Sequence, residues 1–135
     1  MADWNRELSE ADLRSIQAGL APDLAGRSVS TLLEKWSCLV DEIVEGYVLT
    51  IYDYTNDLTT RQLLQDIGDS LQGALAERFG AAIGTIDERF LAATEPALSP
   101  LYKQSASMFW IQRVPRVRVG ELRDDLLTFG HVKQA

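Results

Sequence analysis

Apolar residues recur every three or four positions over much of the chain, a spacing that places side chains on one face of an α-helix. The first such stretch covers residues 8–20 and is preceded by a capping signal, because Ser9 stands where it can accept a hydrogen bond from the Asp12 amide. Pro22 and Gly26 follow, and proline cannot continue a helical hydrogen-bond ladder. The pattern predicts a short N-terminal helix.

A second and longer apolar stripe begins after Thr31, which has capping-box spacing with Glu34. It predicts one continuous helix of about seven turns. The stripe consists of Leu33, Trp36, Val40, Ile43, Tyr47, Ile51, Tyr54 and Leu58, and Leu32, Leu39, Val44 and Val48 widen it. The opposite face is predicted to be solvated and acidic, with Glu34, Lys35, Asp41, Glu42, Glu45 and Asp53.

Residues 54–58 are predicted to form the corner where this helix ends. Thr59 and Gln62 have the spacing of another capping box, so a third helix is expected to begin directly after Thr59. In this interpretation Asn56 and Asp57 bond to local amides of the corner.

The third helix is predicted to run from residue 60 to about residue 93, again with apolar steps of three and four. Gly80 and Gly84 lie inside it, and glycine weakens a helix by up to about 1 kcal/mol relative to alanine. The sequence leaves open whether the helix is continuous through these glycines or breaks there.

The helical spacing is lost from residue 95 onward. Pro96, Pro100 and Pro115 disfavour helix, and residues 116–119 alternate with strand period. Residues 95–119 are therefore predicted as an extended strap that lays Trp110 onto the helices, followed by a short helix over 120–129. The expected fold is an all-α, antiparallel helical bundle in one domain, 1–135, built on two long helices with short N- and C-terminal helices and an extended C-terminal strap.

Charge narrows the range of partners. The 135 residues include 13 Lys and Arg against 20 Asp and Glu, for a net charge of −7. Phosphates repel such a chain, so we expect no general nucleic-acid binding. Residues 1–100 carry seven basic against seventeen acidic residues, whereas 101–135 carry six against three. Either the basic tail folds back on the acidic part, or the acidic part is offered to a basic partner.

The N-terminal residues contain neither a basic start nor a long apolar run, which predicts no signal peptide and no membrane span. A single cysteine, Cys38, cannot form an internal disulfide, and its position within the predicted helix favours a buried structural thiol. A reducing, cytoplasmic location is the simplest interpretation.

Few catalytic chemistries are available to this chain. His131 is the only histidine, and the chain has no CxxC, HExxH, glycine-rich phosphate loop or EF-hand loop. Carboxylate pairs occur at helical spacing, but charge on a solvated face explains them better than a magnesium site does. We therefore predict no catalytic residue, cofactor or metal, which favours a binding protein over an enzyme and leaves the enzyme question open.

Two groups of residues remain as candidates for a ligand site. The first combines tyrosine hydroxyls, carboxylates and an arginine that could hold a small anion or only stabilise the corner: Tyr47, Tyr54, Asp57, Arg61 and Asp87. Whether Asp87 reaches Arg61 is left open. The second lies in the tail and could stack and neutralise single-stranded nucleic acid or hold the strap onto the acidic helices: Trp110, Arg113, Arg116 and Arg118.

Size and charge favour a non-enzymatic protein-interaction module that docks a basic protein surface. Small acidic helical antagonists, such as immunity and antitoxin proteins, have this physical profile. The predicted contacts are Asp41, Glu42, Glu45, Asp53 and Asp57. A structural homo-oligomer, for example a homodimer, and a small-ligand-binding helical bundle are the alternatives.

Overall fold

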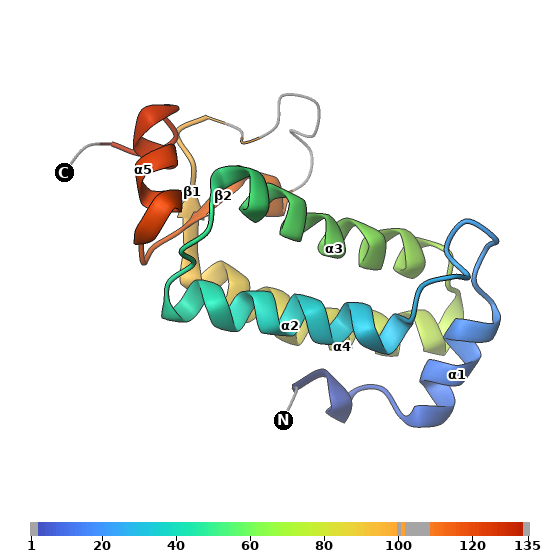
Figure 1. Cartoon of the computed structure of the whole chain (residues 1–135). Coiled ribbons are helices and arrows are strands. Elements are labelled where there is room, and N and C mark those ends of the chain that lie inside the picture. The colour runs from blue at the N-terminus through green and yellow to red at the C-terminus, as the bar shows by residue number, and fades with distance from the viewer. Residues whose placement is uncertain (1–2, 100, 102–108, 134–135) are drawn as a thin grey trace. The chain divides into compact units, whose positions relative to one another are not determined.

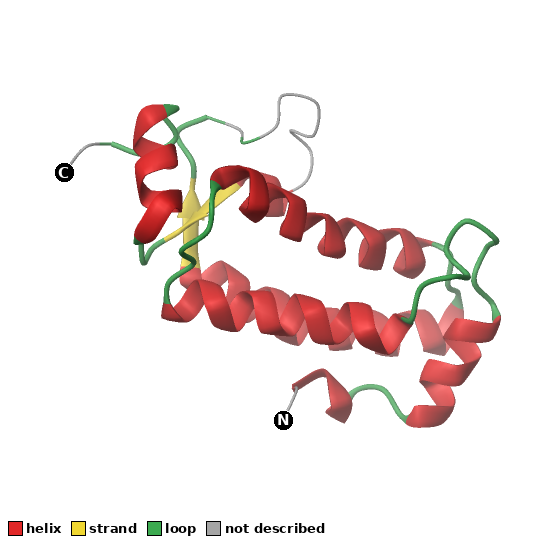
Figure 2. Ribbon diagram, in the orientation of Figure 1, coloured by secondary structure: helices red, strands yellow, loops and turns green. Residues whose placement is uncertain are grey.

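The computed structural model describes residues 3–99, 101 and 109–133. The chain is mostly helical, as predicted (Figures 1 and 2). The described helices are α1 (Glu10–Ala18), α2 (Val29–Glu45), α3 (Ile51–Asp69), α4 (Gly73–Ala93) and α5 (Gly120–Thr128), with 3₁₀ turns at Asp3–Arg6 and Phe109–Gln112. A small antiparallel sheet pairs β1 (Thr94–Pro96) with β2 (Arg113–Pro115), and Thr94 lies opposite Pro115.

Contacts within the chain define two compact units. The first unit consists of Met1–Cys38 and Thr60–Arg89, and the second of Leu39–Thr59 and Phe90–Ala135. The fully buried side chains of the first unit include Leu33, Trp36, Leu64, Ile67, Phe79 and Ile86. Those of the second unit include Ile43, Tyr54, Leu58, Phe90, Val114 and Leu126. Each unit thus has an apolar core of its own.

The cap at the start of α1 forms as predicted. The Ser9 hydroxyl accepts from the Asp12 amide at 3.0 Å, and the Asp12 carboxylate accepts from the Ser9 amide at 3.1 Å. Arg78 of α4 donates to both carboxylate oxygens of Asp12, at 2.9 and 3.1 Å. This guanidinium, together with the Ser9 amide, lowers the pKa of Asp12 below its ordinary value of 3.8. Local capping and a contact distant in sequence therefore stabilise the same helix end.

The prediction of one long helix up to Leu58 is wrong. The helix α2 ends at Glu45, and Gly46 follows with φ of 126°, a conformation that side chains with a Cβ rarely adopt. A Cβ at Gly46 would also approach Cγ2 of Val119 to 2.9 Å. A new helix, α3, begins at Ile51 and is capped by Thr50, whose hydroxyl accepts from the Asp53 amide at 3.1 Å.

The predicted corner at 54–58 is wrong for the same reason, because these residues lie inside α3. Thr59 does not cap a helix but donates its hydroxyl to the Asn56 carbonyl at 2.6 Å. The chain leaves the helical conformation after Asp69 and begins α4 at Gly73. The described part of the chain therefore has three long helices, not two, and α4 is continuous through both glycines that the sequence left in question.

The predicted strap is only partly extended. Its start and end pair as β1 and β2, while Phe109–Gln112 forms a 3₁₀ turn, and residues 100 and 102–108 lie outside the described part of the chain. Trp110 is buried, as expected, and packs edge-to-face on Phe109 with ring centroids 5.0 Å apart. The final helix, α5, confirms the prediction for 120–129. Cys38 is exposed, so the prediction of a buried thiol is wrong.

Candidate functional site

The predicted cluster of five polar residues is two separate groups, one in each unit. In the first unit, the Nε and Nη2 atoms of Arg61 donate to the two carboxylate oxygens of Asp87, both at 2.9 Å. Trp36 donates its indole N–H to the same carboxylate at 3.0 Å, and Nη1 of Arg61 donates to Gln65 at 3.1 Å. Arg61 is buried, with 5% of its surface exposed. Asp87 therefore reaches Arg61, and it joins side chains from α2, α3 and α4.

The second group consists of Tyr47, Tyr54 and Asp57 in the second unit. Tyr47 lies in the loop between α2 and α3 and donates its hydroxyl to Asp57 at 2.5 Å. Tyr54 donates its hydroxyl to the Arg113 carbonyl at 3.0 Å, and the two tyrosine rings meet edge-to-face with centroids 5.3 Å apart. Both hydroxyls thus have partners within the protein, as does the buried guanidinium of the first group, which is the pattern of structural polar residues.

Burial has an electrostatic consequence for both tyrosines. Desolvation, and secondly the hydrogen bond to the Asp57 carboxylate, raises the pKa of Tyr47 above its ordinary value of 10.0. Desolvation also raises the pKa of Tyr54, against a smaller opposing effect of Arg113. The folded state therefore holds both phenols in the neutral form.

We expect the protein to lose stability in alkali because of these two phenols. Below pH 10 both states are protonated and the tyrosines add no pH dependence, whereas above it only the unfolded chain releases protons. Each pH unit then lowers the free energy of unfolding by about 1.4 kcal/mol per phenol, over a narrower pH range for Tyr47, which borders an open hollow, than for Tyr54. In a pH titration, tyrosinate absorbance from these two residues should appear together with the loss of helical circular dichroism.

Tyr47→Phe and Tyr54→Phe provide the control for this titration. Each variant should reduce the tyrosinate absorbance that appears with unfolding by the contribution of one tyrosine. Reversible ionisation of all four tyrosines near pH 10 in a protein that is still helical would contradict the prediction.

The basic side chains of the tail bind within the second unit. Arg113 donates to the hydroxyl and the carbonyl of Thr94, at 2.8 and 2.9 Å, which ties β2 to β1. Arg116 and Arg118 both pair with Glu95. None of the contacts in the described part of the chain brings these arginines to the acidic residues of α2, so the interpretation that they hold the strap on that surface is not supported.

Four of the five predicted partner-binding carboxylates are exposed. These are Asp41, Glu42, Glu45 and Asp53, while Asp57 is half-buried and accepts from Tyr47. Asp53 also accepts from the amide and the hydroxyl of Thr50, so its charge helps to cap α3. Glu42 and Glu45 make no hydrogen bond or ion pair with the residues that the structure describes. Residues 39–59 contain five carboxylates and no Lys or Arg, which makes this segment strongly acidic.

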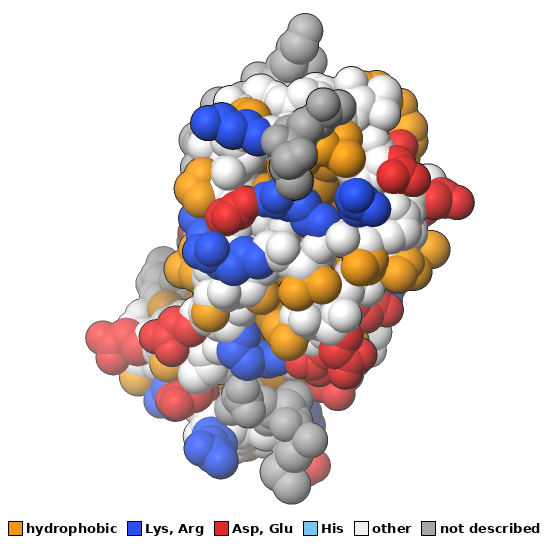
Figure 3. All heavy atoms as spheres, turned by 90° about the vertical axis from the view of Figure 1, so that its left-hand side faces the viewer, with side chains coloured by type: hydrophobic (Ala, Val, Ile, Leu, Met, Phe, Trp, Pro, Cys, Tyr) orange, Lys and Arg blue, Asp and Glu red, His pale blue; other side chains and the backbone are white. Residues whose placement is uncertain are grey.

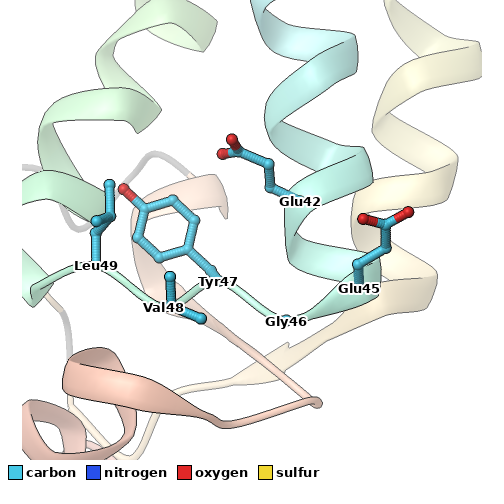
Figure 4. A pocket seen from close by; sticks show the side chains of 6 residues that line it. All are labelled: Glu42, Glu45, Gly46, Tyr47, Val48 and Leu49. Carbon is cyan, nitrogen blue, oxygen red and sulfur yellow. The ribbon is translucent and has the colours of Figure 1, made fainter.

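A shallow hollow lies where the chain leaves α2. It is lined by Glu42, Glu45, Gly46, Tyr47, Val48 and Leu49 and has a volume of about 130 Å³. Figure 4 shows the Tyr47 ring between Leu49 and Glu42. Pockets for drug-sized ligands measure about 300–1,000 Å³, so this hollow is large enough for one side chain but too small for such a ligand.

Large exposed apolar side chains occur only in the second unit, among the residues that the structure describes. They are Val44, Val48, Leu49, Tyr52, Leu91, Leu98, Val117, Val119 and Phe129. The sequence did not predict this surface, because Val44 and Val48 fit the buried stripe, yet they are 51% and 55% exposed. In Figure 3, which faces the side of Figure 1 where α5 lies, apolar side chains are exposed between charged ones.

Six of these side chains gather where residues 46–52 run beside α5 and the segment that precedes it. We call them the apolar seam: Val48, Leu49, Tyr52, Val117, Val119 and Phe129. Gly120 lies against the backbone of Val48, and Gly46 lies against Val119. At the other end of α5, the rings of Tyr52 and Phe129 meet with centroids 6.4 Å apart. The hollow connects this seam to the two glutamates of α2.

The described residues contain no group of three or more His, Cys, Asp or Glu side chains that could hold a metal ion. No helix among them is both long and apolar enough to cross a membrane. The chain matches no protein-family model, no curated protein and no solved structure.

Proposed function

We propose that the protein is a non-enzymatic, cytoplasmic interaction module that binds a basic surface of another protein through Glu42 and Glu45. The observation that carries this proposal is the charge at the carboxyl end of α2. That end has the negative pole of the helix dipole, its last turn contains no basic residue, and both glutamates are exposed there. Like charges at a helix end cost stability, and a cationic partner would offset that cost.

The helices are proposed to pack as the antiparallel bundle expected from the sequence, in a single domain. In this arrangement the polar groups of the candidate ligand site serve the core. Their hydroxyls and guanidinium are already hydrogen-bonded, which favours a structural role over the binding of a small anion.

The proposal predicts that a cationic peptide without apolar residues binds to the protein through the two glutamates. The double variant Glu42→Gln/Glu45→Gln neutralises both side chains. It should bind a fluorescent peptide of glycine and lysine about three- to tenfold more weakly than the wild type, because exposed charge pairs contribute about 0.2–1 kcal/mol each. Fluorescence anisotropy at low ionic strength measures this, and added salt should reduce the difference.

The matched control is Glu77→Gln/Glu88→Gln, which makes the same change in net charge at two exposed positions of α4. If the peptide responds only to the net charge of the protein, its affinity should fall equally in both double variants. Equal weakening would therefore rule out a specific acidic site at the end of α2.

A further inference from the structure

We infer that the apolar seam is the second half of the same interface and that it receives an amphipathic basic helix of a partner protein. This inference rests on the proposed function, because the acidic end of α2 selects the charge of the occupant. It adds the form of the partner: apolar side chains on one face of a helix, with a lysine or arginine beside them.

Two backbone groups along the seam are already hydrogen-bonded within the protein, which disfavours the addition of a strand at this point. The Val48 carbonyl accepts from the Glu121 amide at 3.0 Å, and the Ile51 amide donates to the Asp125 carboxylate at 2.9 Å. A partner strand needs free amides and carbonyls, whereas a helix satisfies its own backbone and needs only side-chain contacts. The seam offers side chains, so a helix is the form of partner that fits it.

The side chains of the seam are strongly exposed. Tyr52 is 71% exposed and Leu49 is 51% exposed, although both belong to segments with buried neighbours such as Ile51. Contiguous exposed apolar side chains with a charged rim are typical of protein-interaction sites, and an exposed tyrosine is a frequent anchor in such sites.

Charge complementarity determines which helix fits. Glu42 and Glu45 reach the seam through the hollow, whose other walls include Val48 and Leu49. A lysine or arginine there would lay its methylene stem on the apolar walls and place its charge near the carboxylates. On the α5 side, exposed Glu121 and Asp124 outnumber exposed Arg123, while Arg116 and Arg118, which flank Val117, both pair with Glu95.

A second copy of the chain is a poorer occupant. A symmetric dimer places the same surface of each protomer against the other. Glu42 and Glu45 of both protomers would then lie within one interface. The chain also carries a net charge of −7, which adds repulsion between copies. The seam therefore fits a cationic partner better than it fits itself.

The test uses two synthetic peptides with the same leucine and lysine content. One forms an amphipathic helix with leucines on one face, and the other has a scrambled order without an apolar face. The full-length protein should bind the amphipathic peptide at least about tenfold more tightly than the scrambled one in fluorescence anisotropy, a difference of about 1.4 kcal/mol.

The double variant Leu49→Asn/Tyr52→Asn should remove this difference while leaving the affinity for the scrambled peptide unchanged. Both side chains are exposed and the substitutions are neutral, so neither folding nor the charge of the site should change. Leu91→Asn is the matched control, because Leu91 lies in the same unit, is 41% exposed and does not belong to the seam. This variant should bind both peptides as the wild type does.

Three other outcomes would contradict the location of the interface, the proposed function or the identity of the occupant. If Leu49→Asn/Tyr52→Asn keeps the tenfold preference while Glu42→Gln/Glu45→Gln weakens both peptides, the seam is not the interface and the proposed function stands. If the glutamine variant binds both peptides as the wild type does, the proposed function fails, and the inference with it. If light scattering shows the protein alone as a dimer that Leu49→Asn/Tyr52→Asn dissociates, the occupant is a second copy.

Discussion

Replacing Asp87 with alanine is expected to lower the free energy of unfolding by about 3–5 kcal/mol, because it leaves the buried guanidinium of Arg61 without its carboxylate. The Arg61 side chain is only 7% exposed, so water cannot replace the lost partner at low cost. Trp36 would also lose the acceptor of its indole N–H. Urea-induced unfolding followed by circular dichroism measures the change.

Glu88→Ala is the control for this experiment, since Glu88 is the neighbouring residue of the same helix and is exposed. It should change the stability by no more than about 0.5 kcal/mol. The double variant Arg61→Met/Asp87→Leu should be more stable than Asp87→Ala, because it removes the unpaired charge. A loss below about 1 kcal/mol in Asp87→Ala would show that the pair is effectively solvated.

Replacing Gly120 with alanine is expected to lower the stability by about 2–4 kcal/mol for two separate reasons. Gly120 has φ of 62°, where an added side chain costs about 1–2 kcal/mol. A Cβ there would also lie 2.7 Å from the carbonyl oxygen of Val48 and 2.9 Å from its Cα. These are backbone atoms, so relief requires the loop to move, which adds about 1–2 kcal/mol in the range seen for overpacked sites.

Gly73→Ala separates the two causes. Gly73 also stands at a helix start, its φ of 63° matches that of Gly120, and nothing lies within 4 Å of an added Cβ. It should therefore show only the backbone cost, and thermal unfolding of both variants gives the contribution of the contact with Val48 by difference. Equal losses of stability in the two variants would mean that this contact is loose.

Short-range chemistry made part of the fold predictable. The cap of α1 needs only Ser9 and Asp12, three positions apart, and the last helix was evident from its own residues. The break between α2 and α3 was not predicted, because Tyr47 and Ile51 happen to continue the spacing of the apolar stripe. Both are buried, as the stripe implied, but Tyr47 lies in a loop and Ile51 begins a new helix. The end of α2 depends on Gly46, which lies against Val117 and Val119, two residues that are distant in sequence.

The candidate site shows the same division between local and distant information. The acidic residues of 39–59 could be identified from composition, because hydration keeps most charged side chains at the surface. The apolar seam could not, because Val48 belongs to the buried stripe by spacing alone. Its exposure depends on which segments cover it, and α5 lies against its backbone while leaving its side chain uncovered.

The sequence by itself determined that the chain is mostly helical, that α1 is capped at Ser9 and that the net negative charge lies within residues 1–100. These properties depend on backbone propensities and on interactions between residues a few positions apart. Only the tertiary structure decided that Asp87 pairs with Arg61, that Gly46 ends α2 and that the seam stays exposed. Each of these depends on contacts between residues that are distant in the chain, and their free energy is gained only when the fold brings those residues together.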